Sequence, residues 1–162
     1  MSSGGDPPCW AHLFDDERPD LDSRSSIERF VRDFYRDIAQ DDLLGPIFAG
    51  AHVDWPSHIA TLTDFWAWQL LGERGYSGNP LRAHEPLHQR DPLRTPHFER
   101  WLTIFDETID AGYHGPRAQL AKQRARRMSR AMQRLLTGSS EVGGVALEPV
   151  LQPGSAEHRP LS

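Results

Sequence analysis

Apolar residues recur every three or four positions over four stretches of the chain, which is the spacing of one face of an α-helix. The first stretch begins near residue 25, where Ser25 and Glu28 form a capping-box pattern. The polar pair Asp41-Asp42 and then Gly45-Pro46 are expected to end this helix, and Ile47-Phe48 to follow in an apolar turn. Its inward face is predicted to consist of Ile27, Phe30, Val31, Phe34, Tyr35 and Ile38.

The second stretch begins near Asp54, with Pro56 placed where a first helical turn accepts proline, and Gly72 is expected to stop it. One feature interrupts the usual pattern, because His58 lies one turn into the helix beside an aromatic-lined face. The predicted apolar stripe is Ile59, Leu62, Trp66 and Leu70, with Leu62 and Phe65 next to the histidine on its flank.

Residues 72–94 are rich in proline and glycine and read as a long loop, a kind of segment that is usually functional or disordered. Asn79-Pro80 is expected to open one short helical turn that reaches His84. Pro86 is expected to stop that turn, because the residue before a proline avoids the helical region.

The last two stretches predict helices that start at Thr95-Pro96 and after Gly115-Pro116 and end at Gly112 and Gly138. With no convincing strand and no repeat, the chain is predicted to be all-α. The expected inward residues are Phe98, Trp101, Leu102, Phe105 and Ile109 in the third helix, and Ala121, Ala125, Met128, Met132 and Leu135 in the fourth.

The length and composition of the chain limit the number of domains that it can form. A chain of 162 residues supports one domain with a hydrophobic core, which we place at residues 25–138. Residues 1–24 are predicted to be a disordered or loosely packed tail and residues 139–162 a disordered one, since both are rich in small and polar residues.

Charge and cysteine content exclude several classes of protein. The formal net charge of −5 argues against a protein built for bulk nucleic-acid binding, and the lone Cys9 excludes an internal disulfide and cysteine-based metal sites. No signal peptide and no apolar run of the ~20 residues needed for a membrane span are visible, so a cytoplasmic location is expected.

The fourth helix concentrates positive charge. Seven of the 18 basic residues and no acidic residue lie at positions 115–138. Such a strip could bind an acidic partner or a nucleic-acid backbone. The favoured interpretation is an ordinary solvated helix face, because a well-formed apolar face runs along the same helix.

Three histidines, His84, His88 and His97, lie between the second and third helices. A four-residue spacing would aim His84 and His88 at one zinc ion on a continuous helix, but Pro86 between them makes that helix improbable. Three further residues, Tyr35, His58 and Trp101, combine an apolar body with a hydrogen-bond donor, and lie on or beside the apolar stripes. If they met at one cavity, they would stabilise a small, partly anionic ligand.

An ordered set of residues resembles the truncated haemoglobins over residues 27–136, and no single motif in it is specific alone. The first half of the set is Phe34-Tyr35, Leu44-Gly45-Pro46-Ile47-Phe48, Trp55, His58, Phe65-Trp66 and Leu70-Leu71-Gly72. The second half resembles the group III branch in particular and consists of Tyr76-Ser77-Gly78-Asn79-Pro80-Leu81, His84, His97-Phe98 and Arg100-Trp101-Leu102.

The resemblance implies a two-over-two helical sandwich, a shortened globin fold, around haem b. It matches His84 to the proximal iron ligand, with His88 and His97 as extra histidines of lower rank. Phe48, Leu62 and Trp66 are expected against the haem, and Arg82 is expected to pair with a propionate. Tyr35, His58 and Trp101 are matched to the distal positions, and Trp68 is an additional aromatic residue without a matched role.

This resemblance implies a five-coordinate or weakly six-coordinate haem that binds dioxygen, nitric oxide and carbon monoxide. So many donors favour oxygen activation, nitric oxide detoxification or peroxidase-like chemistry over bulk oxygen transport. Dioxygenase activity and an unidentified reductase partner are further expectations. The alternative function is a haemless helical interaction domain that uses the basic fourth helix to bind an acidic partner or nucleic acid.

Overall fold

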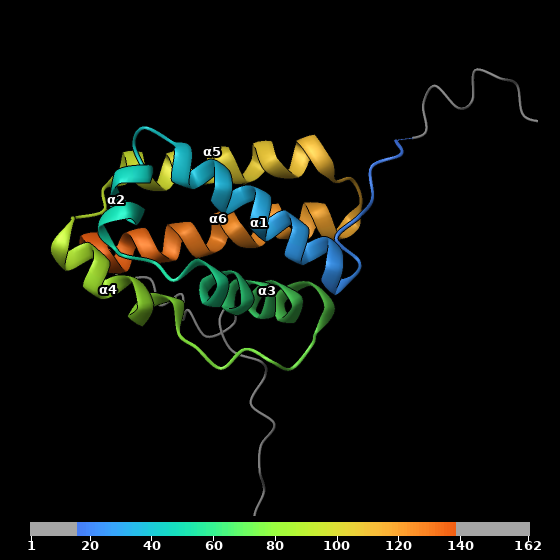
Figure 1. Cartoon of the computed structure of the whole chain (residues 1–162), viewed down its shortest axis with the longest axis horizontal. Helices are drawn as coiled ribbons and strands as arrows, with labels where there is room; N and C mark the ends of the chain where they lie inside the picture. Colours follow the sequence, from blue (N-terminus) through green and yellow to red (C-terminus); the bar gives the residue numbers. More distant parts are fainter. Residues whose placement is uncertain (1–15, 139–162) are drawn as a thin grey trace, which may run out of the picture.

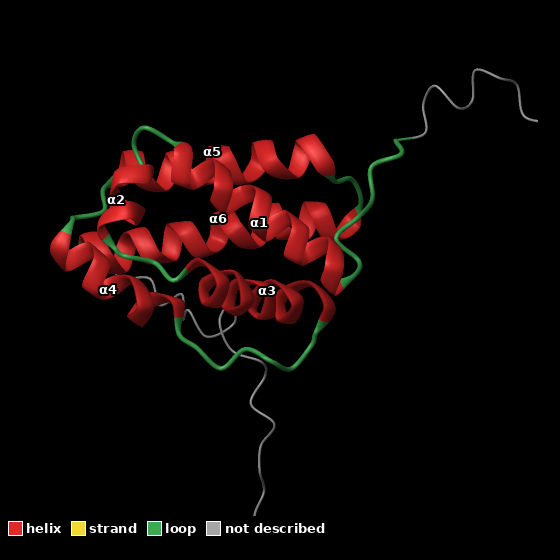
Figure 2. Ribbon diagram, viewed as in Figure 1, coloured by secondary structure: helices red, strands yellow, loops and turns green. Residues whose placement is uncertain are grey.

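The computed structural model describes residues 16–138, and every regular element in that part of the chain is a helix (Figure 2). The prediction of an all-α fold is therefore confirmed. In chain order the elements are α1 (Arg24–Gln40), α2 (Gly45–Gly50), α3 (Trp55–Leu71), α4 (Pro80–Arg90), α5 (Thr95–Gly112) and α6 (Pro116–Thr137).

Four long helices form two pairs, α1 with α3 and α5 with α6 (Figure 1). The pairs are also in contact with each other, α1 against α5 and α3 against α6, which makes a two-over-two sandwich. Large apolar side chains fill the space between the pairs because each long helix turns an apolar face inward. The largest fully buried ones are Trp66, Phe30, Phe34 and Phe105.

The start of the chain's first helix differs from the prediction. The N-cap is Ser23, whose hydroxyl accepts the Ser26 backbone N–H, while the Ser26 hydroxyl accepts the Ser23 N–H. Serine at the third helical position thus completes the box that Glu28 was expected to complete. Downstream, the predicted apolar turn at Ile47-Phe48 belongs to the short helix α2, which begins at Gly45 with proline in its first turn.

The prediction for α3 is confirmed at both ends. Asp54 is the N-cap, and Gly72 ends the helix with a left-handed φ of 70°, which glycine adopts without a steric cost. Ile59, Trp66 and Leu70 are buried as expected, and Leu62 is half-buried.

The prediction that Pro86 stops the helix around His84 is wrong. Helix α4 continues through Pro86 to Arg90. Proline at that position removes the N–H that would bond the carbonyl of Arg82. Both residues are exposed, so water can hydrate the freed carbonyl and the helix continues over the protein surface.

Helix α6 ends at Gly138 as predicted, with a φ of 69°, but Leu135 does not face inward. Its side chain is 52% exposed, whereas Ala121, Ala125, Met128 and Met132 are buried. The neighbouring Leu136 packs partly against the core instead.

Four of the seven basic residues of α6 contact the rest of the fold. Lys122 pairs with Asp110, and Arg126 Nη2 lies 2.6 Å from Asp106 Oδ2. Arg117 Nε donates to the Leu70 carbonyl at 3.1 Å, and Arg124 donates to the Gln69 side chain. Most of this positive charge therefore serves to hold α6 against its neighbours.

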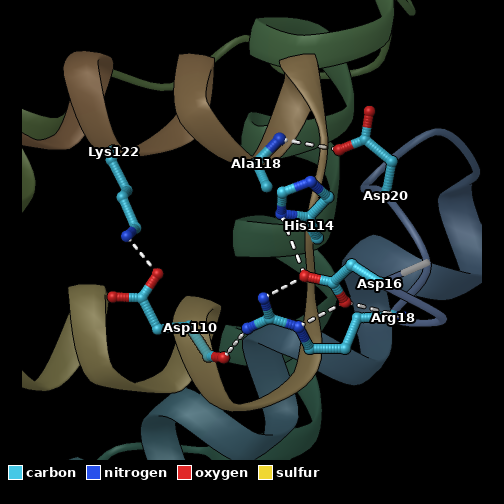
Figure 3. Close-up of polar contacts among 7 residues, drawn as sticks. All are labelled: Asp16, Arg18, Asp20, Asp110, His114, Ala118 and Lys122. Atoms are coloured by element: carbon cyan, nitrogen blue, oxygen red, sulfur yellow. Dashed lines mark hydrogen bonds and ion pairs between the residues drawn. The ribbon is translucent and has the colours of Figure 1, made fainter. Parts of the chain in front are cut away.

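Residues 16–24, which the sequence placed in the N-terminal tail, pack against the helices. Leu21 is fully buried, and the Asp20 carboxylate accepts the backbone N–H of Arg117 at 3.1 Å. It also accepts the backbone N–H of Ala118 at 2.8 Å (Figure 3). Gly115 permits this approach, because a Cβ there would lie 2.5 Å from the Asp20 carboxyl carbon. The expectations for residues 1–15 and 139–162 lie outside the described residues.

Within residues 16–138, no helix has both the length and the apolar character that a membrane crossing requires.

Candidate functional site

All six helices contribute side chains to one cavity, lined mainly by apolar and aromatic residues. Its volume of about 160 Å³ is on the order of ten times the space that a single buried water needs. The cavity is therefore larger than an ordinary packing defect and can hold a ligand.

Seven of the eight residues that the sequence proposed for the site line this cavity. They are Tyr35, Phe48, His58, Leu62, Trp66, His84 and Trp101. The eighth, Arg82, is exposed in the first turn of α4 and is not among the lining residues.

Helix α4 fixes the orientation of the His84 imidazole. Asn79 caps the helix by accepting the backbone N–H groups of Leu81 and Arg82 at 3.0 and 3.3 Å. His84 Nδ1 lies 2.6 Å from the backbone carbonyl of Pro80, one turn earlier. A carbonyl oxygen can only accept, so Nδ1 carries the proton and Nε2 of a neutral ring keeps a lone pair.

The other two histidines of this region have the opposite arrangement. Nδ1 of His88 accepts the backbone N–H of Leu93 at 2.9 Å, and Nδ1 of His97 accepts that of Arg94 at 2.9 Å. In their neutral forms both rings carry the proton on Nε2, which makes that atom a donor and not a metal ligand. Only His84 of the three presents a free Nε2 lone pair.

The continuous helix α4 does place His84 and His88 four residues apart, as the zinc hypothesis required. However, no group of three or more metal-ligating side chains gathers anywhere in residues 16–138. The described residues thus contain the continuous helix that the zinc hypothesis needs, but no third ligand joins the two histidines.

Hydrogen-bond donors reach the cavity from α1 and α5. The Trp101 indole N–H bonds to the Tyr35 hydroxyl, so the hydroxyl oxygen acts as acceptor and its own hydrogen stays available to a ligand. Burial raises the pKa of Tyr35 well above its ordinary value, and the bond from Trp101 only partly opposes this. Tyr35 therefore remains a neutral donor at physiological pH.

His58 brings a third polar group to the cavity, from α3. Its ring lies edge-on to Tyr35 and Trp55, with ring centroids 5.2 and 5.9 Å apart. Burial lowers the pKa of His58, and protonation of His84 would lower it further, so the ring is neutral. Its Nε2 is buried and has no hydrogen-bond partner among the described residues.

A buried polar atom without a partner costs free energy, and such atoms are often completed by a ligand. His58 Nε2 is one of two such side-chain atoms in the described part of the chain. Its position on the cavity wall indicates that the cavity binds a group with which it can form a hydrogen bond.

Sequence reasoning missed part of the cavity wall. Met128 and Met132 were predicted as core residues of α6 but line the cavity, and Tyr76 was noted only within a longer motif. The signal for the methionines was their four-residue spacing on a face that is otherwise alanine, which leaves space beside two flexible side chains. Leu87, Leu93 and Phe98 complete the apolar wall near α4 and α5.

These donors and walls fit a large apolar group that carries a metal ion. One imidazole lone pair from α4 would bind the ion, and apolar side chains would cover the group. Polar groups from α1 and α3 would face a small polar ligand, while Trp101 of α5 orients the Tyr35 hydroxyl. A haem has these requirements, so the residues present fit that group.

Comparisons with known proteins agree with this chemistry. The family model described as bacterial-like globin matches residues 20–136. The group 3 truncated haemoglobin ctb of Campylobacter jejuni is 34% identical over 118 residues, which cover 70% of this chain and 91% of that protein.

Two further matches agree with the first. The group 1 truncated haemoglobin GlbN of Nostoc commune is 32% identical over 80 residues, covering 49% of this chain and 63% of that protein. The crystal structure of the group III truncated haemoglobin from Campylobacter jejuni matches with a TM-score of 0.63 at 35% identity, over 70% of this chain and 91% of that one.

Proposed function

The chain belongs to the bacterial-like globin family, as a group III truncated haemoglobin, and from this premise we propose that it uses haem b to activate dioxygen or detoxify nitric oxide. Membership of the family implies haem-based binding of small diatomic ligands. The finer assignment of ligand, reaction and residue roles is our proposal.

The tautomer of His84 is the observation that carries the proposal. Its Nδ1–H donates to the Pro80 carbonyl, which leaves the lone pair of Nε2 to bind an iron ion and would increase the basicity of the ring. Phe48, Leu62 and Trp66 would cover the haem with apolar surface. Arg82, which is exposed in the first turn of α4, would pair with a haem propionate.

When bound, haem supplies an iron ion that takes a diatomic ligand and exchanges electrons. Tyr35 donates its hydroxyl hydrogen to that ligand, while Trp101 holds the hydroxyl in place. His58 stays neutral and supplies either a donor or an acceptor at Nε2, according to its tautomer. These groups stabilise negative charge on the ligand and slow its release.

Slow release of the bound ligand favours a reaction of that ligand over the delivery of oxygen. Two polar groups directed at one small ligand, Tyr35 and His58, with Trp101 orienting the first, suit oxygen activation, nitric oxide detoxification or peroxidase-like reduction of peroxide. Each of these reactions consumes electrons, so a reductase partner is part of the proposal.

The test is a set of haem spectra of the purified holoprotein beside a His84→Gly variant. We expect stoichiometric haem with ferric, ferrous and carbon-monoxide spectra in the parent, and loss of this haem in the variant, restored by added imidazole. His88→Gly and His97→Gly are the matched controls, because their Nδ1 atoms accept backbone N–H groups and both should retain the parent spectrum. A parent that folds without taking up haem, or a spectrum that depends on His88 or His97, would overturn the assignment.

A further inference from the structure

Trp68 and Tyr76 form an aromatic pair that connects the cavity with the protein surface. Tyr76 lies in the segment between α3 and α4 and lines the cavity. Trp68 lies on α3, is not among the cavity-lining residues, and is half-buried. No role proposed above uses either side chain.

The two rings are stacked, with centroids 5.9 Å apart and an interplanar angle of 17°. Phe65, which also lines the cavity, lies edge-on to both, at 5.1 Å from Tyr76 and 6.0 Å from Trp68. These distances are typical of aromatic rings in direct contact. Phe65 therefore holds the stack against the cavity wall.

Gly78 leaves space for the Tyr76 hydroxyl. A Cβ at residue 78 would lie 2.8 Å from the hydroxyl oxygen and 3.0 Å from the ring carbon that bears it. Any side chain at residue 78 would force the Tyr76 ring to move. Gly78 thus allows the Tyr76 ring to lie on the cavity wall and stack on Trp68.

Tyrosine and tryptophan are the side chains most readily oxidised by one electron without a metal ion, whereas phenylalanine is not. Electrons pass rapidly between aromatic rings in contact because their orbitals overlap. A tyrosine on the cavity wall, stacked on a tryptophan that reaches solvent, has the arrangement needed for such a transfer.

We propose that Trp68 and Tyr76 form an electron relay, and that the exposed edge of Trp68 is an oxidation site for aromatic one-electron donors, such as phenols and aryl amines, too large for the cavity. The proposal rests on the proposed function, since it requires haem in the cavity and a peroxide as oxidant. It extends that function from small gases to reductants that act at the surface.

The electrons and protons balance as follows. Reduction of one hydrogen peroxide to two waters takes up two electrons and two protons. Each electron leaves Tyr76 towards the cavity while the hydroxyl proton passes to water. Trp68 then returns an electron to Tyr76, which takes up a proton again, and a donor molecule in solution reduces Trp68. One peroxide therefore oxidises two donor molecules by one electron each.

A second pair of aromatic residues, Trp55 and Tyr35, provides the control for the relay. Trp55 is also half-buried and lies 6.1 Å from Tyr35, but the rings are tilted by 52° and the Tyr35 hydroxyl is already bonded to Trp101. Trp55→Phe is therefore the matched variant for Trp68→Phe, because it removes another half-buried indole, one that contacts Tyr35 and not Tyr76.

The experiment treats the ferric holoprotein with hydrogen peroxide and a nitroso spin trap, and locates the trapped radical by peptide mass spectrometry. We expect the adduct on Trp68 in the parent and in Trp55→Phe, on Tyr76 in Trp68→Phe, and on neither residue in Tyr76→Phe. Oxidation of the bulky dye ABTS should be lost in Trp68→Phe, while its haem spectrum remains that of the parent.

Each other outcome overturns the relay. An adduct that persists on Trp68 in Tyr76→Phe would show that Trp68 is oxidised without Tyr76. An adduct on Trp55 that persists in Trp68→Phe, with no label at residues 68 or 76 in the parent, would assign the transfer to Tyr35 and Trp55. Absence of haem before peroxide is added would refute the proposed function, whereas haem without a trapped radical would refute the relay alone.

Discussion

The hydroxyl oxygen of Tyr35 accepts the Trp101 N–H, which leaves the hydroxyl hydrogen for a ligand. Tyr35→Phe removes that donor and keeps the ring contacts with Phe34 and His58. The lost hydrogen bond is worth about 1–2 kcal/mol, so dioxygen should dissociate roughly tenfold faster in stopped-flow experiments.

Tyr113→Phe provides the control for this prediction. Tyr113 is equally buried but packs against Phe30, and it is not a lining residue of the cavity. Its loss should leave the dissociation rate unchanged. Equal rates for the parent and Tyr35→Phe would show that Tyr35 does not bond the ligand.

The sequence could identify the site residues but not their hydrogen bonds. Tyr35, His58 and Trp101 stood out as polar tips among apolar stripes, and the family pattern brought them together. The choice among three histidines depends on Nδ1 partners, namely the carbonyl of Pro80 and the N–H groups of Leu93 and Arg94. Those partners exist only once α4 and the start of α5 are folded, so spacing alone could not reveal them.

At the scale of the elements, α4 contains an internal proline, which normally costs about 3 kcal/mol in a helix interior. Pro86→Ala restores an N–H that can bond the Arg82 carbonyl. We expect a gain of about 1–3 kcal/mol in the free energy of unfolding, from the restored bond and higher helix propensity. Hydrogen exchange of the α4 peptides should slow as well.

Pro96→Ala separates this effect from the general consequence of removing a proline. Pro96 is exposed in the first turn of α5, where proline costs no helical hydrogen bond. That variant should show no gain, because only the unfolded chain becomes more flexible. A gain of similar size in both variants would contradict the explanation given for α4.

The positions of the long helices were largely predictable from the sequence. Periodicity located α1, α3, α5 and α6, because burial of one face dominates the energetics of long helices, but the N-cap of α1 is Ser23 and not the predicted Ser25. The short helices α2 and α4 have little apolar face of their own and depend on contacts with the rest of the fold. The misplaced Leu135 lies in the last turn of α6, where the core has ended and periodicity no longer indicates burial.

A buried carboxylate joins the turn between α1 and α2 to α5. Asp41 accepts the Arg100 Nε–H at 2.7 Å and the backbone N–H groups of Leu43 and Leu44 at 3.1 and 3.0 Å. Burial opposes ionisation, but these donors outweigh it and lower the pKa of Asp41 below its ordinary 3.8. Because the native pKa is the lower one, this stabilisation is present above pH 3.8 and is lost as the pH falls through the native pKa.

Asp41→Asn should therefore lower the free energy of unfolding by about 2 kcal/mol near neutral pH. The difference from the parent should shrink when thermal unfolding is followed down to acidic pH. Asp42→Asn, which changes the same charge at an exposed neighbour, should show no such pH dependence. A deficit in Asp41→Asn that is constant with pH would contradict a role for the ionised carboxylate.

For the whole molecule, the cavity is a product of the complete fold, because all six helices contribute side chains to its wall. Alanines on the inner face of α6 bring this helix close to its neighbours, and Met128 and Met132 then adjoin the cavity. Composition revealed many aromatic residues but not whether they enclose a cavity or a solid core, since both consist of the same side chains. The resemblance to the truncated haemoglobins predicted a cavity and not a solid core, and the packing of the six helices produces that cavity.

The same whole-molecule view explains why the folded unit begins before residue 25. Residues 16–21 run past the end of α5 and the start of α6, where Arg18 bonds the Asp110 carbonyl and Asp20 caps α6 (Figure 3). The first backbone N–H groups of a helix have no partner within the helix, so a carboxylate supplied from elsewhere stabilises it directly. A tail that supplies this cap is part of the domain.

Asp20→Ala should thus lower the free energy of unfolding by about 2 kcal/mol, because two N–H groups of α6 lose their partner. The matched variant is Asp16→Ala, which removes the same charge from an exposed pair with Arg18 and His114. Exposed pairs contribute little, so Asp16→Ala should unfold close to the parent in urea. Equal losses in the two variants would mean that net charge, and not the cap on α6, is what the N-terminal segment contributes.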